Sequence, residues 1–378
     1  MTEAATFRAG RGVSREPLTV ASPGPGQVRV GIRATGVCHS DLHIVNGDWP
    51  SEQPLVLGHE AAGVVEEAGP GVTTVQPGDH VVLSWFAPCG RCVNCAAGRG
   101  WLCTGTTALS NTLPDGTTAF RDDDGEPLWP YLGLGTFTPE VVVPESAAVK
   151  VDERLPFTVG ALLGCSVTTG VGAVLNTAKV PAGASAVVIG CGGVGLSVVM
   201  GLRLAGADPI IAVDLSEEKR AMARELGATV TLDPRETDLS EFVTEQLGGV
   251  DFAFEAIGNE KVIETLPGLL APGGAAVLVG MTRIGARASI DPFDLADQGK
   301  SILGCNYGSS VAQVDIPRLA RLHLAGLLPL ERLIDRVRPL SEAADALEDL
   351  ATGNTGGSLI FLPRGAAADL TVNPPETK

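Results

Sequence analysis

Hydrophobic and polar positions follow two different rhythms along this chain. In residues 1–150, short apolar runs such as QVRVGIRATGV and DHVVLSW are separated by turns rich in glycine and proline. That rhythm is typical of short strands in an antiparallel, loop-rich domain. Between about 167 and 305, short apolar runs alternate with longer segments of helical periodicity. Such alternation predicts βαβ units and a parallel sheet.

The second region gives the sharper predictions. Strands are expected at SAVVIG and PIIAVD and within GGVDFAFEAIG and GGAAVLVGM. Helices are expected at 193–207, 215–228, 314–328 and 340–353. The segment 104–130 is polar and rich in turn residues, so we expect a surface loop there.

Length and charge narrow the class of protein. The 378 residues suggest two domains. The net charge of −17 disfavours nucleic acid and anionic membranes as partners, because both would repel the surface. The first residues, MTEAATFRAGRG, contain no apolar signal segment, and no apolar run reaches the ~18 residues of a membrane span. We therefore expect a cytoplasmic protein whose thiols stay reduced.

Four of the eight cysteines lie in one short stretch with the spacing C-x2-C-x2-C-x7-C. Tetrahedral zinc is bound by four thiolates at such spacings, and four sulfurs leave no position for a substrate. The spacing therefore predicts a structural zinc site, with free thiols, disulfides or an iron–sulfur cluster as alternatives. The predicted ligands are Cys89, Cys92, Cys95 and Cys103.

The stretch 190-GCGGVG-195 matches the dinucleotide-binding pattern G-x-G-x-x-G, between a predicted strand and a predicted helix. Gly190 would make the tight turn, Gly192 would admit the pyrophosphate, and Gly195 would let the helix pack on the strand. Asp214 closes the next predicted strand and would accept hydrogen bonds from a ribose 2′-hydroxyl, which favours NAD over NADP. The predicted cofactor loop comprises Gly190, Gly192, Gly193, Val194 and Gly195.

Rare residues also cluster in 37-VCHSDLH-43 and 58-GHE-60, and a further cysteine lies in 163-LGCSVTTG-170. Spacing alone does not link these segments. Together with GTFTPEVVVP, VVIGCGGVGLSVVMG and IIAVDLSEEK, they resemble the zinc-dependent alcohol dehydrogenases of the medium-chain dehydrogenase/reductase superfamily. The resemblance covers residues from about 15 to 365.

This resemblance implies an α/β fold with two domains. Residues 1–166 and 307–378 would form a catalytic domain containing a GroES-like β-barrel and both zinc sites. Residues 167–306 would form a Rossmann domain, a doubly wound parallel sheet, with the active site between the two. Members of the family are homodimers or homotetramers, so a homo-oligomer is expected.

The resemblance also implies a catalytic zinc site. Its ligands would be Cys38, His59 and Cys165, with Glu60 able to approach the metal during ligand exchange. Three protein ligands leave an open position for the alcohol. Asp41 would orient His59 through its second ring nitrogen.

Family positions for proton transfer and cofactor binding fall on four further residues. Ser40 and His43 match the relay that carries the alcohol's proton through the cofactor ribose to a surface histidine. His39 matches a position that contacts the pyrophosphate, and Lys219 matches the lysine on the adenosine ribose.

The chain departs from the family's pattern at the expected basic residue on the pyrophosphate and at residues expected near the substrate pocket. Gly357 stands where many members carry a basic residue on the pyrophosphate, which predicts weak NAD binding or a compensating cation. Trp49 and Trp85 would line the substrate pocket and narrow it. Trp49 and a threonine-rich stretch stand where glutathione-dependent formaldehyde dehydrogenases carry an acid and an arginine, which disfavours a thiol adduct.

The resulting prediction is an NAD-dependent zinc alcohol dehydrogenase, EC 1.1.1.-, with two zinc ions per chain. It would act on primary aliphatic or aromatic alcohols and their aldehydes. One alternative on the same fold retains NAD through turnover, and another oxidises a thiol–formaldehyde adduct. A non-catalytic NAD-binding protein is the alternative from another class.

Overall fold

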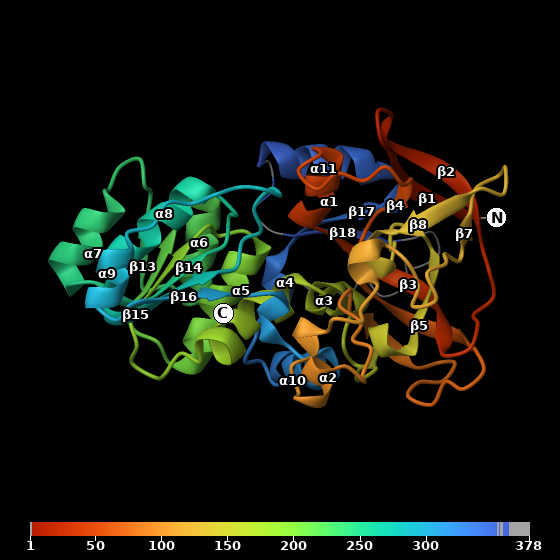
Figure 1. Ribbon diagram of the computed structural model, residues 1–378, viewed down its shortest axis with the longest axis horizontal. Helices are drawn as coiled ribbons and strands as arrows, with labels where there is room; N and C mark the ends of the chain where they lie inside the picture. The colour runs from red at the N-terminus through yellow and green to blue at the C-terminus, as the bar shows by residue number, and fades with distance from the viewer. Residues whose placement is uncertain (1, 354, 356–357, 363–378) are drawn as a thin grey trace, which may run out of the picture.

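The computed structural model describes residues 2–353, 355 and 358–362, arranged as two parts side by side (Figure 1). One part contains six strands, all paired in parallel, in the order β13-β12-β11-β14-β15-β16. That order is the doubly wound order 3-2-1-4-5-6. The strands are β11 (Ala186–Ile189), β12 (Ile210–Val213), β13 (Val230–Leu232), β14 (Val250–Glu255), β15 (Leu270–Leu278) and β16 (Ser301–Gly304).

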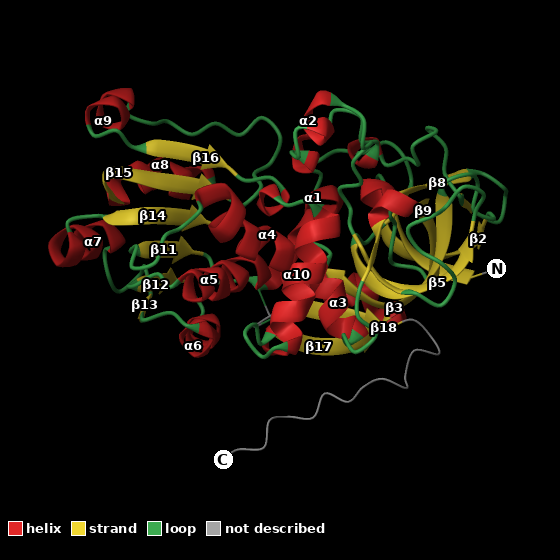
Figure 2. Ribbon diagram, turned by 90° about the horizontal axis from the view of Figure 1, so that it is seen from below, coloured by secondary structure: helices red, strands yellow, loops and turns green. Residues whose placement is uncertain are grey.

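Helices cover this sheet on both faces, as Figure 2 shows. Alternate residues of β11 enter two separate cores. Val188 packs in the core that includes Leu196 of α5, whereas Val187 packs in the core that includes Val243 of α7 and Leu266 of α8. Burial on both faces explains the continuous apolar runs in the sequence. The helices of this part of the chain are α5 (Gly193–Ala205), α6 (Glu217–Leu226), α7 (Leu239–Leu247), α8 (Glu260–Leu269) and, with no buried residue, α9 (Pro292–Asp297).

The other part is built from two β structures. A closed barrel has the order β1-β2-β7-β8-β4, and a seven-stranded sheet has the order β10-β6-β5-β3-β18-β17, with β9 also paired to β3. The barrel strands are β1 (Thr2–Arg8), β2 (Gly12–Val20), β4 (Leu55–Val56), β7 (Phe120–Arg121) and β8 (Pro127–Pro130). The sheet strands are β3 (Gln27–Val37), β5 (Glu60–Ala68), β6 (His80–Leu83), β9 (Glu140–Pro144), β10 (Ala148–Lys150), β17 (Ile334–Pro339) and β18 (Ser358–Leu362).

The predicted α/β fold class, a Rossmann sheet with a β-barrel part, is therefore confirmed. The prediction of a surface loop at 104–130 is wrong in part. β7 and β8 close the barrel, and Leu113, Phe120 and Leu128 are buried. Two strands of two and four residues are too short to show a hydrophobic alternation.

Six helices belong to the barrel-containing part or join it to the nucleotide-binding sheet. Helix α4 packs against α5 and thereby links the two parts. The helices are α1 (His39–Val45), α2 (Val93–Ala96), α3 (Phe157–Leu163), α4 (Ser166–Gly172), α10 (Ala312–Leu324) and α11 (Ala343–Thr352). In the part of the chain that the structure describes, no single helix is long and apolar enough to cross a bilayer, although the bent pair 157–163 and 166–178 passes on length and composition alone.

Candidate active site

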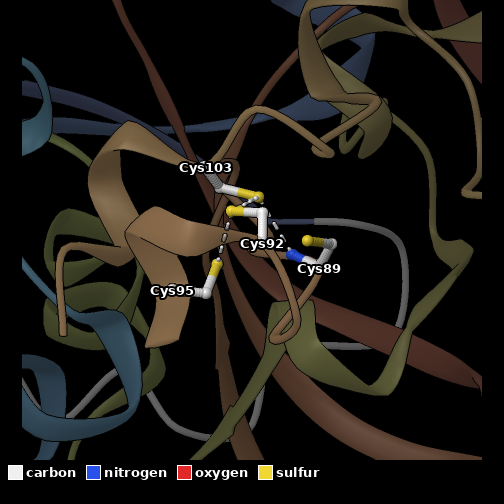
Figure 3. A group of neighbouring side chains, drawn as sticks. All are labelled: Cys89, Cys92, Cys95 and Cys103. Atoms are coloured by element: carbon white, nitrogen blue, oxygen red, sulfur yellow. Dashed lines mark hydrogen bonds between the residues drawn. The ribbon is translucent and has the colours of Figure 1, made fainter. Parts of the chain in front are cut away.

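The four clustered cysteines converge around α2, as Figure 3 shows. The sulfur of Cys92 lies 3.5 Å from that of Cys95 and 3.9 Å from that of Cys103. A tetrahedron with Zn–S bonds of ~2.3 Å has sulfur–sulfur edges of about 3.8 Å, whereas a disulfide is ~2.05 Å long. All eight cysteines are free. The sulfurs therefore already have the spacing of a four-thiolate zinc site.

Backbone N–H groups favour thiolates in this cluster. Sγ of Cys103 accepts hydrogen bonds from the amides of Cys89 (3.2 Å) and Gly105 (3.3 Å). Backbone hydrogen bonds from Cys95 and Thr104 lower the pKa of Cys92 to about 5. A thiolate is the form that binds zinc, so the donors prepare the site for the metal.

A second group of possible ligands comes from three distant segments. Cys38 precedes α1, His59 and Glu60 lie at the start of β5, and Cys165 precedes α4. One ligand atom from each of these four residues lies within 4.8 Å of the others. His59 and Glu60 are each only 1% exposed. The fold thus brings together the residues that spacing alone did not connect.

The surroundings of His59 fit a metal ligand. Its Nδ1 faces Oδ2 of Asp41 at 3.5 Å, and Nε2 has no hydrogen-bond partner within the described residues. Asp41 is itself fixed, because its carboxylate accepts from the amides of Gly58 (2.9 Å) and Cys38 (3.2 Å). A buried imidazole nitrogen without a partner is costly unless a ligand occupies it. Zinc fits this position.

Charge in the group also favours a cation. A hydrogen bond from Cys165, with help from His59, lowers the pKa of Cys38 well below its ordinary value. Burial, followed by the charge of Cys38, raises the pKa of Glu60 well above its ordinary value. Cys38 is therefore the thiolate of the group, and burial beside this thiolate favours the protonated form of Glu60.

Ser40 and His43 lie on α1, next to this group. Oγ of Ser40 is 3.7 Å from Sγ of Cys38, and the Ser40 carbonyl accepts a 2.7 Å hydrogen bond from the hydroxyl of Tyr131. His43 contacts Asp48 through Nδ1 (3.0 Å) and the carbonyl of Met281 through Nε2 (3.1 Å). No local sequence pattern marks Tyr131, Asp48 or Met281, so their contacts with these residues appear only in the structure.

The glycine loop has the shape that a dinucleotide requires. Gly190 has φ +94°, and a Cβ at Gly195 would lie 1.7 Å from the carbonyl oxygen of Gly190. A Cβ at Gly192 would meet nothing within 4 Å, so the loop is open there. Helix α5 begins at Gly193 and directs its N-terminus at this space, where a phosphate is favoured. The residues present therefore fit NAD.

Asp214 lies beside this loop. Its carboxylate accepts from the amides of Cys191 (2.7 Å) and Ser216 (2.8 Å). Lys219 lies on α6, whose N-cap is Ser216, and His39 is exposed at the start of α1. Asp214 is thus held in place between the loop and α6.

The two predicted pocket tryptophans have different partners. Trp49 stacks on His43 with ring centroids 4.4 Å apart, and its indole N–H donates to the carbonyl of Thr282 (3.1 Å). Trp85 packs edge-on against Phe86 and Tyr307. Gly357 lies outside the described residues.

The fold and the site together define a zinc-dependent dehydrogenase with a nicotinamide cofactor. They combine a parallel nucleotide-binding sheet, a neighbouring β-barrel, two clusters of zinc-type ligands and a glycine loop. Family models agree: "Alcohol dehydrogenase GroES-like domain" matches residues 24–153, and "Zinc-binding dehydrogenase" matches residues 193–323. The chain belongs to the NAD-dependent zinc alcohol dehydrogenases of the medium-chain dehydrogenase/reductase superfamily.

Individual relatives point to more than one substrate. The chain is 38% identical over 370 residues to "S-(hydroxymethyl)glutathione dehydrogenase" of Paracoccus denitrificans, covering 95% of this chain and 98% of the relative. It resembles the crystal structure of benzyl alcohol dehydrogenase from Acinetobacter calcoaceticus with a TM-score of 0.90 and 32% identity, covering 96% and 99%. An alcohol dehydrogenase zinc-binding domain protein from Burkholderia ambifaria gives a TM-score of 0.91 and 39% identity, covering 96% and 98%.

Proposed function

We propose that this enzyme oxidises a hydroxymethyl group to a formyl group with NAD, which gives an aldehyde from a free primary alcohol and a formyl thioester from a thiol–formaldehyde adduct. The observation that carries the proposal is the convergence of Cys38, His59 and Cys165 next to an open glycine loop. These three residues would hold the catalytic zinc, and Cys89, Cys92, Cys95 and Cys103 would hold the structural zinc. Bound zinc supplies a Lewis acid that lowers the pKa of the substrate hydroxyl, and NAD supplies the hydride acceptor.

Residues of the chain would position the substrate and move its proton. Ser40, near Cys38 on the first turn of α1, would accept the hydroxyl proton, and His43 would pass it toward solvent. Asp41 would keep His59 in the tautomer that offers Nε2 to the metal. Glu60 would exchange with the substrate at the open position.

Cofactor contacts are proposed from the same geometry. Gly190, Gly192, Gly193, Val194 and Gly195 would bind the pyrophosphate from the loop and the N-terminus of α5. Asp214 would accept from the adenosine ribose, with Lys219 on the same ribose and His39 on the pyrophosphate. We propose that the boundaries at 166/167 and 306/307 separate the two domains and that the chain assembles as a homodimer or homotetramer.

The proposal also specifies a substrate class. The curated relatives favour the thiol–formaldehyde adduct over the free alcohol that the sequence alone favoured, because they are named for S-(hydroxymethyl)glutathione. Such an adduct also presents a hydroxymethyl group. We therefore place adducts of formaldehyde with a small thiol first.

Free primary alcohols are the second candidate. Trp49, fixed by Thr282, offers an indole rather than a carboxylate near α1, which suits a flat or unbranched alcohol. The likeness to benzyl alcohol dehydrogenase supports the same class.

One assay separates the two candidates. NADH formation should be measured on protein with a counted zinc content, using formaldehyde with glutathione, formaldehyde with a smaller thiol, and benzyl alcohol. A higher kcat/KM for an adduct supports the first candidate, and a higher value for benzyl alcohol supports the second. Activity that persists after gel filtration without added NAD would identify an enzyme that retains its cofactor. No NADH from any substrate would favour a non-catalytic protein and refute the proposal.

A further inference from the structure

Cys165, one of the candidate metal ligands, lies at a bend between two helices. Helix α3 ends at Leu163 and α4 begins at Ser166, and the helical segments 157–163 and 166–178 differ in direction by 51°. Cys165 itself has φ −145° and ψ −75°, outside the helical region. The direction of its side chain therefore depends on how the bend is held, because the backbone sets the direction of the Cα–Cβ bond.

The hydroxyl of Tyr307 contacts this bend. It donates a 2.8 Å hydrogen bond to the carbonyl of Gly164, the residue before Cys165, and Tyr307 is only 3% exposed. A Cβ at Gly164 would lie 2.8 Å from the carbonyl oxygen of Leu83, so the bend is also packed closely against β6. Because the hydrogen bond is buried, removing the hydroxyl would leave the Gly164 carbonyl without this partner in a place that water does not readily reach.

Tyr307 belongs to a strained turn that follows the nucleotide-binding sheet. It lies three residues after the end of β16. Tyr307, Gly308 and Ser309 have φ of +51°, +64° and +48°. The left-handed region disfavours the two residues of this turn that carry a side chain, and such strain persists only where the surroundings hold it.

Helix α4 and the residues after it hold this turn. A Cβ at Gly308 would lie 2.3 Å from the carbonyl oxygen of Thr168, so the turn approaches the helix backbone closely. Oγ of Ser309 lies 2.8 Å from Oγ1 of Thr177. The turn is thus fixed against the helix that follows the bend, and the side chain of Tyr307 extends from the turn back to the bend.

We propose that Tyr307 is a positioning residue for the catalytic metal, because its hydroxyl fixes the Gly164 carbonyl and thereby the direction in which Cys165 offers its sulfur. The ligand would then be held by the segment that joins the nucleotide-binding sheet to α10. Hydrogen bonds behind a metal ligand set its orientation and raise the affinity of the site. The inference rests on the proposed function, since it takes Cys165 as a zinc ligand.

Tyr307→Phe removes the hydroxyl and keeps the ring that packs edge-on against Trp85, with 5.2 Å between ring centroids. We expect zinc to leave the three-ligand site of this variant at least about threefold faster than that of wild type in excess chelator. Release from the four-cysteine site should be unchanged. With cobalt in place of zinc at the three-ligand site, the thiolate-to-metal charge-transfer band should weaken or shift, because one of its two sulfurs is no longer directed at the ion.

Two further variants separate the hydroxyl of Tyr307 from the packing of the turn. Thr177→Val removes the hydroxyl contact with Ser309 in the same turn and should release zinc at the wild-type rate. Tyr307→Met also lacks the phenol hydroxyl, and its flexible side chain can fill the space of the ring, so it gives the test if Tyr307→Phe fails to fold. Circular dichroism of each variant verifies folding.

Equal zinc release and equal cobalt spectra for Tyr307→Phe and wild type would overturn the proposal. Release from Thr177→Val as fast as from Tyr307→Phe would also overturn it, since the effect would then belong to the turn as a whole. If wild type holds only the ion of the four-cysteine site, the proposed function fails and this inference fails with it. If wild type holds two ions, the comparison with Tyr307→Phe decides this inference alone.

Discussion

Asp41 faces the second nitrogen of His59 at 3.5 Å while two backbone amides hold its carboxylate in place. Both side chains are buried, with Asp41 0% and His59 1% exposed. The carboxylate would therefore fix which imidazole nitrogen is offered to a zinc ion, and its charge acts in a medium that screens little.

We expect Asp41→Asn to weaken zinc binding at the catalytic site by about 10- to 100-fold, because the amide cannot supply the same charge to His59. Zinc retained against a graded chelator measures this. The four-cysteine site serves as the internal control and should keep its ion. A variant that holds two ions as firmly as wild type would contradict the assigned role of Asp41.

The four-cysteine site should stabilise the fold without taking part in the chemistry. Cys92→Ser should reduce the zinc content from two ions to one and lower the thermal midpoint by roughly 5 °C, because metal binding contributes folding free energy. Activity per folded molecule should stay within about twofold of wild type. Cys305→Ser, outside both clusters, should keep two ions. Loss of both ions from Cys92→Ser would show that the two sites are not independent.

An ion-pair network fixes the loop that carries Asp214. Arg220 donates to the carbonyl of Asp214 (2.6 Å) and to the carboxylate of Asp233 (2.9 Å). Arg235 bonds the same carboxylate and donates to the carbonyl of Leu215 (2.7 Å). Asp233 therefore aligns two guanidinium groups behind the proposed ribose-binding acid.

Asp233→Asn should raise the KM for NAD at least about threefold, equivalent to roughly 0.7 kcal/mol, with little change in kcat, because the loop loses its alignment. Steady-state kinetics with varied NAD measure this change. Glu236→Gln, an exposed neighbouring acid, is the matched control. An unchanged KM, or a loss confined to kcat, would refute the role of the network.

Glu255 predicts a pH dependence of stability. It is 0% exposed at the end of β14, where Oε1 accepts from the amides of Ile257 and Gly258 and Oε2 has no partner within the described residues. Burial raises its pKa, and the backbone hydrogen bonds offset this only in part. The folded state thus keeps a proton that the unfolded chain loses near pH ~4.3, so Glu255 makes stability fall as pH rises from there through the raised pKa.

Glu255→Gln should remove this contribution. As pH rises above ~4.3, its urea midpoint should fall less than that of wild type, because the amide carries no charge to bury. Glu245→Gln on α7, which is exposed, should follow wild type. Parallel pH curves for wild type and Glu255→Gln would show that the carboxyl is ionised without cost.

Local signals explain which parts of the fold the sequence predicted. The strand expected at SAVVIG is β11, and the helix expected at 193–207 is α5, because burial on both faces and helical periodicity are both visible within one element. The sequence does not predict the barrel strands β7 and β8. Their residues are buried because they pair with strands distant in the sequence, and no local hydrophobic pattern indicates this pairing.

The candidate active site shows the same difference between residues that a local pattern predicts and residues that only the fold brings together. The four-cysteine cluster is visible as spacing within one loop. Cys38, His59 and Cys165 required a family resemblance, because the fold alone brings these three segments together. The sequence does not predict the contacts of Asp48 and Tyr131. A single acid or tyrosine in a turn forms no recognisable sequence pattern until its partner in the fold is known.

The last described strand, β18, inserts between β17 and β3, and its Leu359 is paired with Val37, the residue before Cys38. This end of β3 is already paired with β5 through Gly36 and Glu60, and it gains its second neighbouring strand only once residues 358–362 have been synthesised. The nucleotide-binding half, whose strands are all encoded between residues 186 and 304, has no such delay. Synthesis would thus complete the nucleotide-binding sheet before the strand pairing beside Cys38 is complete.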